Sequence, residues 1–375
     1  MTGTRGWFDL PARQWVDLFY DLTVAAGIIA ISGSFAYDHS GSGTLWFAVV
    51  YGLLWCTWLL TSAATGSLTS AGLEHTALSV TVLVGQMGVL LLLAITAGDS
   101  LPESAELFDL LLGAALLLTL VLWVRSDLRT PRLGKRRPSV PTVLTAVGIA
   151  VLGVSWFLHS RAGVVMWLIA LGAVAAASWS VAFDRGIDTH RLVHRLGELT
   201  LIVIGETLVK LTLTVEAETV WSVHLIALVP VLGILSAIWW IYFRTLTDTT
   251  TLGHATQLMW TAAHLPLHLG LLGLAVGLAK LTVGAPELAE HNGSVSLLAA
   301  PLALVLAAIT GLAFVARARS RSVLVAATAA LTAGCALAGA WDAPLVTAYA
   351  GGGVVLAAAA AYALRWRRAL ADDRA

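Results

Sequence analysis

The chain has 375 residues, of which 58% are hydrophobic and only 12% are charged. Soluble globular proteins carry about 25% charged residues, so this composition excludes an ordinary soluble domain and indicates a polytopic membrane protein in contact with the lipid bilayer. The 22 basic and 22 acidic residues cancel, and because the basic residues are dispersed, no nucleic-acid partner is expected.

Apolar segments of about 20 residues, the length that crosses a bilayer, recur along the whole chain. Backbone groups that face lipid must be hydrogen-bonded within their own segment, so we expect these segments to be α-helices. The sequence therefore predicts an all-α polytopic membrane protein with about twelve transmembrane helices. The predicted spans are residues 15–36, 44–64, 72–97, 107–125, 141–160, 162–183, 196–215, 220–243, 254–281, 294–316, 322–341 and 344–364.

The basic residues between these spans fall on one side of the membrane when the N-terminus is placed in the cytoplasm. Of the 22 Lys and Arg residues, 19 then lie inside, one (Arg161) lies outside, and two (Lys210 and Lys280) lie within spans. Cytoplasmic loops of membrane proteins are rich in Lys and Arg. We therefore predict a multi-pass protein of the inner (plasma) membrane with both termini in the cytoplasm.

Similar residues recur in the same order in the two halves of the chain. The matched pairs are 21–27 with 198–205, 55–58 with 238–241, His75 with His254, and Gln86 with His268. A unit of six helices keeps its orientation when it is repeated, so the pattern predicts a parallel 6+6 repeat about an axis along the membrane normal. The expected halves are residues 1–190 and 191–375.

Ionisable side chains inside the predicted spans are the first candidates for a functional site, because a charge at mid-bilayer costs about 2.5–3.5 kcal/mol. Asp17 and Asp21 in the first span are four residues apart, on one face of the helix. Two carboxylates there repel each other unless a proton, a metal ion or a basic residue lies between them. The alternative, which we favour, is that Asp17 is solvated at the interface and only Asp21 is buried and paired.

The seventh span contains Glu206 near its middle, with Lys210 one helical turn later. This spacing and order favour an ion pair within the helix. Either the pair neutralises itself, or Glu206 takes up protons or binds a cation while Lys210 extends towards the interface. The sequence leaves both interpretations open.

The ninth span contains His264 and His268 on one face, with Pro266 between them, where we expect a kink. Two such histidines could ligate a metal ion or relay protons. We favour the alternative that they form hydrogen bonds to neighbouring helices. Gln86, in the third span, is a further polar group at mid-depth.

The eighth span ends on the cytoplasmic side with Trp239-Trp240-Ile-Tyr242-Phe243-Arg244. Aromatic residues are common at the membrane interface, which explains this segment without a specific function. Arg244 could alternatively reach Asp17 or Asp21, which are expected at the same depth. The resulting candidates for a cytoplasmic gate are Asp17, Arg195, Trp240, Tyr242 and Arg244.

Several of these motifs together resemble the bacterial low-temperature-requirement A (LtrA) family. Asp17-Leu-Phe-Tyr-Asp21-Leu22 is similar to the family's opening Glu-Leu-Phe-Phe-Asp-Leu. Arg195-Leu-Gly, followed by Ile202-Val-Ile-Gly205-Glu206, is similar to its Glu-Arg-Phe-Gly and Ile-Ile-x-Leu-Gly-Glu motifs. Trp239-Trp240-Ile-Tyr242-Phe243 and His264-Leu-Pro266 resemble its Trp-Trp-x-Tyr-Phe-Asp and His-x-Pro segments.

The chain departs from the family pattern at three of its acidic positions. His194 and Arg244 stand where the family has acids, and Asp17 replaces a Glu. Two acids that could pair with Arg195 are therefore missing from the motifs. The resemblance implies a membrane location, and it implies no established reaction.

Three functions fit the sequence. The first is a secondary transporter or ion-coupled permease, whose substrate- or ion-binding candidates are Asp21, Gln86, Glu206, Lys210, His264 and His268. The second is an intramembrane enzyme that acts on a lipid or isoprenoid-like substrate, with Asp21, Glu206 and His268 converging on one cavity. The third is a membrane stress-response protein without turnover. The sequence identifies no cofactor, metal ion or substrate.

Overall fold

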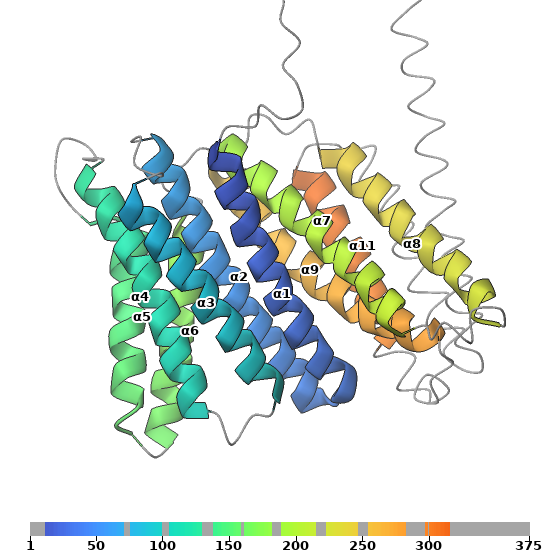
Figure 1. The fold of residues 1–375 in the computed structure, drawn as a ribbon, viewed down its shortest axis with the longest axis horizontal. Coiled ribbons are helices and arrows are strands. Elements are labelled where there is room, and N and C mark those ends of the chain that lie inside the picture. Colours follow the sequence, from blue (N-terminus) through green and yellow to red (C-terminus); the bar gives the residue numbers. More distant parts are fainter. Residues whose placement is uncertain are drawn as a thin grey trace, which may run out of the picture. The chain divides into compact units, whose positions relative to one another are not determined.

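Every element that the structure describes is helical. The computed structural model describes residues 12–70, 76–99, 105–129, 138–158, 161–181, 189–214, 223–246, 254–282, 297–298 and 300–315. The helices of these ranges are α1 (Ala12–Tyr37), α2 (Gly41–Ser70), α3 (Ala77–Asp99), α4 (Ala105–Arg129), α5 (Val140–Ser155), α6 (Arg161–Ser180), α7 (Thr189–Thr214), α8 (Val223–Leu246), α9 (His254–Thr282) and α11 (Ala300–Val315) (Figure 1).

The ten described helices overlap the first ten predicted spans, which confirms an all-helical fold for the described residues. Six of them, α1, α2, α3, α4, α6 and α9, contain segments long and apolar enough to cross a membrane. Shorter apolar segments lie on α5, α8 and α11, whereas the described part of α7, the predicted seventh span, contains neither kind of segment. The last two predicted spans, 322–341 and 344–364, lie outside the described residues, so the total of twelve stays a prediction.

Three predicted boundaries need correction. The seventh span was expected to begin at residue 196, but α7 begins at Thr189. The second span was expected over 44–64, but α2 continues to Ser70 and has 30 residues, about 45 Å at 1.5 Å per residue. The fifth was expected to reach residue 160, but α5 ends at Ser155 and is followed by a turn. Hydropathy locates an apolar segment, whereas hydrogen bonding decides where the helix ends.

The chain divides into two compact units within α7. Unit 1 consists of Met1–Tyr37 and Ser42–Arg195, and unit 2 of Asp38–Gly41 and Leu196–Ala375. In unit 1, α1 packs against α3, α3 against α4, α4 against α5, and α5 against α6. In unit 2, α8, α9 and α11 pack against one another. The predicted six-helix repeat stays a prediction.

The helix α2 is the core of unit 1. Every residue from 53 to 68 is buried, including Trp55 and Trp58. A helix that is apolar around its whole circumference is expected in such a central position. Several polar groups of α2 find partners on neighbouring helices: Trp58 bonds to Asp21 on α1, and Ser67 bonds to Ser126 on α4.

Glycines bring α9 into backbone contact with α11 in unit 2. A Cβ atom at Gly270 would lie 2.9 Å from Val305 Cγ2, and one at Gly273 would lie 3.0 Å from Pro301 Cγ. At Gly277 a Cβ atom would overlap the carbonyl group of Leu297. Small residues allow such a close approach of two helices. Close packing is important in lipid because apolar burial provides little driving force for helix association there. This contact fixes α9, which carries both histidines.

We therefore expect Gly277→Ala to lower the free energy of unfolding by about 1–3 kcal/mol, the usual cost of forcing an atom into a packed interface. Gly311→Ala, on α11 itself, is the matched control because a Cβ atom there meets no atom of the described residues within 4 Å. The measurement is thermal unfolding of the purified protein in detergent. Equal midpoints for the two variants would contradict the close contact between α9 and Leu297, which precedes α11.

Candidate functional site

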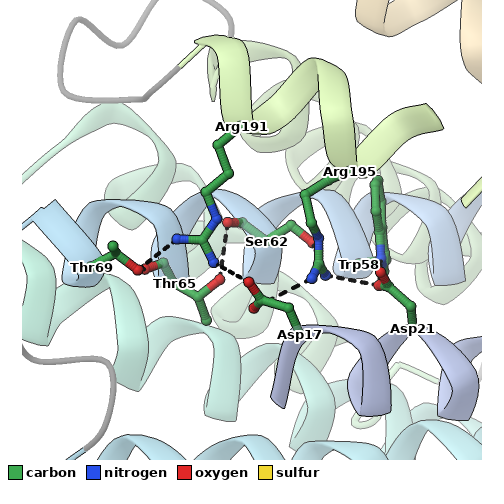
Figure 2. A network of polar contacts seen from close by, with 8 residues as sticks. All are labelled: Asp17, Asp21, Trp58, Ser62, Thr65, Thr69, Arg191 and Arg195. Atoms are coloured by element: carbon green, nitrogen blue, oxygen red, sulfur yellow. Dashed lines mark hydrogen bonds and ion pairs between the residues drawn. The ribbon is translucent and has the colours of Figure 1, made fainter. Parts of the chain in front are cut away.

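Four charged side chains of α1 and α7 form an ionic quartet in unit 1: Asp17, Asp21, Arg191 and Arg195. The two acids are four residues apart on α1, and the two arginines are four residues apart on α7, so each pair lies on one face of its helix. Arg191 Nη2 lies 2.6 Å from Asp17 Oδ2, and Arg195 Nη2 lies 2.8 Å from Asp21 Oδ1. Arg195 Nη1 is also 3.3 Å from the other oxygen of Asp17, so Arg195 bridges both acids (Figure 2).

The helix α2 supplies the remaining contacts of the quartet. Trp58 Nε1 donates a hydrogen bond of 2.8 Å to Asp21 Oδ1. Arg195 donates to Ser62 Oγ at 3.1 Å, and Arg191 donates to the Thr69 hydroxyl. The guanidinium carbon of Arg195 also lies 5.8 Å from the Trp58 ring centroid, within the range of a cation–π contact. The quartet thus joins α1, α2 and the start of α7 (Figure 2).

Burial increases from the Asp17–Arg191 pair to the Asp21–Arg195 pair of the quartet. The side chains of Asp17 and Arg191 are 18% and 12% exposed, whereas those of Arg195 and Asp21 are 5% and 0% exposed. Removing charges from water is costly, and attraction offsets that cost only when each ion keeps its partner. The two positive and two negative charges compensate each other, so the helices can carry them in an apolar environment.

The structure corrects one expectation and adds residues that the sequence reading missed. Asp17 was expected to be solvated, but it is paired with both arginines. Arg191 was counted only as a loop charge. Its four-residue spacing from Arg195 matches that of the two acids, and this signal could have identified it. Trp58 and Ser62 carried no such signal. The Arg244 side chain lies outside the described residues, so its predicted contact with Asp17 or Asp21 stays a prediction.

Unit 2 contains a second buried network, the histidine chain, made of Thr200 (α7), Tyr242 (α8), His264 and His268 (α9). His268 Nε2 lies 2.9 Å from Thr200 Oγ1, and Thr200 Oγ1 lies 3.2 Å from Tyr242 Oη. Tyr242 Oη lies 2.8 Å from His264 Nε2. His264 Nδ1 lies 2.8 Å from the carbonyl oxygen of Trp260. All four side chains are buried, so they depend on one another for hydrogen bonds.

The histidines therefore bond to hydroxyl groups of two neighbouring helices, the arrangement that the sequence analysis favoured over a metal site. Among the described residues, no group of three or more His, Cys, Asp or Glu side chains is arranged to hold a metal ion. The rings of His264 and His268 are 5.9 Å apart at their centroids, edge to face. Tyr242, which was predicted as a gate residue, is a member of the histidine chain.

The other predicted site residues have separate contacts. Lys210 Nζ lies 3.4 Å from Glu206 Oε1 within α7, and the Glu206 side chain is only 2% exposed. Gln86 Nε2 donates to the hydroxyl groups of Thr61 and Thr119 at 2.8 and 2.7 Å, which joins α3 to α2 and α4. Trp240 is half-buried, with its ring against that of Trp239.

Asp21, Glu206 and His268 were expected to converge if the protein is an intramembrane enzyme. Asp21 contacts Arg195 and Trp58, Glu206 contacts Lys210, and His268 contacts Thr200. The expected convergence of these three side chains, which acid–base catalysis within hydrogen-bond reach would need, stays a prediction.

Comparison with known families adds the decisive observation. The family model described as bacterial low temperature requirement A protein (LtrA) matches residues 13–361. The chain belongs to the LtrA family. Comparison with the curated proteins and with the solved structures gave no match. Family membership and the six long apolar helices place this LtrA protein in a membrane.

In this LtrA protein, Arg195 keeps the acidic partners of the opening motif although two other motif acids are missing. His194 and Arg244 stand at two positions where the family motifs have acids. Arg195 nevertheless has two carboxylate partners, Asp17 and Asp21, both on α1. The departure therefore does not leave Arg195 without compensating charge, and the shorter Asp17 still reaches both arginines.

Breaking the inner pair of the quartet should destabilise the protein strongly. We expect Arg195→Met or Asp21→Leu alone to cost about 3–5 kcal/mol, because each leaves a buried charge with fewer partners. The double variant should cost clearly less than the sum of the two single variants. Arg191→Met, in the more exposed pair, should cost less than either. Thermal unfolding in detergent measures all four, and additive losses would contradict direct coupling of Arg195 with Asp21.

Proposed function

We propose that this LtrA protein is a secondary transporter that couples a small solute to protons or ions. The observation that carries the proposal is the ion pair on α7 between the buried Glu206 and Lys210, with 3.4 Å between Lys210 Nζ and Glu206 Oε1. Charges in transmembrane helices are costly, and they commonly mark substrate or ion pathways. Both residues were candidates for binding a substrate or an ion.

The electrostatics of this pair suggest how coupling would work. Ionised Glu206 compensates the ammonium group of Lys210. When Glu206 takes up a proton, that compensation is lost and Lys210 favours an anionic group in its place. A protonated acid and a bound anion therefore stabilise each other, which is a coupling free energy between two ligands. We accordingly propose a small anion as the solute, moving together with a proton.

The test uses the full chain in proteoliposomes on a solid-supported membrane electrode, with a panel of small carboxylates and inorganic anions as probes. We expect an anion-evoked current that grows with an inward proton gradient. Glu206→Gln, which removes the titratable group but keeps its shape, should abolish the effect of the gradient while counterflow of the anion persists. Glu106→Gln, an exposed acid in the first turn of α4, is the matched control.

Two results would contradict the proposal. One is gradient-driven current of unchanged size in Glu206→Gln. The other is the absence of current for every anion of the panel in protein that keeps its thermal unfolding transition. Glu206→Gln/Lys210→Gln removes both charges and should also lack the response to the gradient. This double variant separates loss of coupling from the effect of removing Glu206 from its pair with Lys210.

The membrane topology is part of the same proposal. We propose twelve spans in the inner (plasma) membrane, both termini in the cytoplasm, and a position between α5 and α6 on the outside. A fluorescent protein fused after Ala375 should fluoresce, and alkaline phosphatase fused at residue 160 should be active. An active phosphatase fused at the C-terminus would show an odd number of spans. The expected results follow from the concentration of Lys and Arg in the loops that we assign to the cytoplasm.

A further inference from the structure

The hydrogen atoms of the histidine chain can be placed by counting donors and acceptors. His264 Nδ1 faces the carbonyl oxygen of Trp260 at 2.8 Å. A carbonyl oxygen only accepts, so His264 carries a proton on Nδ1. Burial away from water disfavours a positive charge on the ring. A neutral His264 then has a bare Nε2, and the hydroxyl group of Tyr242 must donate to it across 2.8 Å.

This placement determines the direction of the remaining bonds. The single proton of Tyr242 is used on His264, so Tyr242 Oη accepts from Thr200 Oγ1 at 3.2 Å. Thr200 also has only one hydroxyl proton, which it shares between Tyr242 and the carbonyl oxygen of Leu196. Thr200 Oγ1 must then accept from His268, 2.9 Å away. His268 therefore carries its proton on Nε2.

The opposite placement leaves more groups unsatisfied. If Thr200 donated to His268, no proton would lie between the oxygen atoms of Thr200 and Tyr242. His268 would also carry its proton on Nδ1, which has no hydrogen-bond partner within the described part of the chain. A buried N–H group without an acceptor is rarer in proteins than an acceptor with a free lone pair. In the first placement, every hydrogen-bond donor of the histidine chain has an acceptor.

One basic atom remains available in that arrangement. His268 is fully buried, and the lone pair of its Nδ1 has no donor among the described residues. Every other polar side-chain atom of the histidine chain takes part in a hydrogen bond. The network therefore has a polarity, with an open acceptor at His268 Nδ1 and a closed end at the Trp260 carbonyl group.

We propose that the histidine chain is a proton relay that receives a proton at His268 Nδ1 and delivers its charge to His264. The added proton binds the lone pair of His268 Nδ1, and the Nε2 proton of His268 passes to Thr200 Oγ1. The Thr200 proton passes to Tyr242 Oη, and the Tyr242 proton passes to His264 Nε2. Four N–H or O–H bonds form and three break, so one proton is gained. His264 ends as an imidazolium with both N–H groups bonded.

The relay deepens the proposed transport function, because a proton-coupled transporter needs a path for protons between buried groups. The described part of α11, residues 300–315, has no titratable side chain. α8 provides Tyr242, and α9 provides the two histidines. On α7, Glu198 precedes Thr200 by about 3 Å along the helix axis, and Glu206 and Lys210 follow it by about 9 and 15 Å.

The first test reads the two tautomers directly, by nitrogen-15 NMR of the full chain labelled at its histidines, in lipid at neutral pH. Spectra of the His264→Asn and His268→Asn variants assign the signals. We expect His264 to carry its proton on Nδ1 and His268 on Nε2. Thr200→Val should remove the preference of His268 for Nε2, and Thr200→Ser should keep it. A His268 proton on Nδ1 in the wild-type protein would overturn the proposal.

The second test measures proton movement along the chain without any substrate. The hydroxyl proton of Tyr242 exchanges with deuterated solvent, which is read from the isotope shift of its Cζ carbon. We expect Thr200→Val to slow this exchange about tenfold or more, while Thr200→Ser exchanges at the wild-type rate. Tyr51, a buried tyrosine of unit 1, should be unaffected by either variant. Unchanged exchange at Tyr242 in Thr200→Val would overturn the relay.

Neither measurement depends on transport. A negative result in the anion-current experiment would remove the proposed function and leave both NMR results to decide the relay. Conversely, a His268 proton on Nδ1 would remove the relay and leave the coupling role of Glu206 to be decided by the current.

Discussion

The cost of placing charge in an apolar helix bundle is the constraint on which the other features of this protein depend. Arg195 satisfies it with two carboxylates, one hydroxyl group and one aromatic ring, from α1 and α2. Each ion of the quartet would be expensive by itself, and the two acids and two arginines together are neutral. The quartet explains why a helix with as many charges as α7 can begin against the core of unit 1.

The two units use different means to accommodate buried polar groups. Unit 1 pairs opposite charges and surrounds them with the hydroxyl and indole groups of α2 (Figure 2). Unit 2 contains, besides its Glu206–Lys210 ion pair, a network of neutral side chains in which His264 and His268 each bond to a hydroxyl group. An ion quartet of this kind resists change because each partner holds the next in place. A chain of neutral donors and acceptors can reverse its polarity at little cost, which suits the movement of protons.

The matched residues of the proposed repeat can be compared by their hydrogen-bond and ion-pair partners. Gln86 and His268 occupy equivalent positions in the alignment, and both bond to threonine hydroxyl groups within their own unit. Asp21 and Glu198 are also matched, but Asp21 has its arginine partner on α7. Glu206 has no acidic counterpart in the first half, where Ile28 or Ile29 would align. Function on a repeated scaffold is expected where the two halves differ, and Glu206 is such a position.

The sequence by itself determined the environment, the helical class, the family and most of the residues that need a buried partner. These follow from composition, from the spacing of apolar segments and from motifs, all of which are local properties of the chain. It also identified the His264–His268 face and the Glu206–Lys210 spacing, because residues four apart on a helix are neighbours in any fold.

Only the tertiary structure decided which distant groups compensate each other. It paired Asp17 with Arg191, gave Asp21 the indole of Trp58, and placed Tyr242 with the histidines. It also revealed that the hydroxyl groups of Thr200 and Tyr242 link His268 to His264. These partners come from helices far apart in the sequence, and their choice depends on helix rotation and packing. A hydropathy pattern specifies neither helix rotation nor helix packing, because many partners of equal polarity could compensate the same buried group.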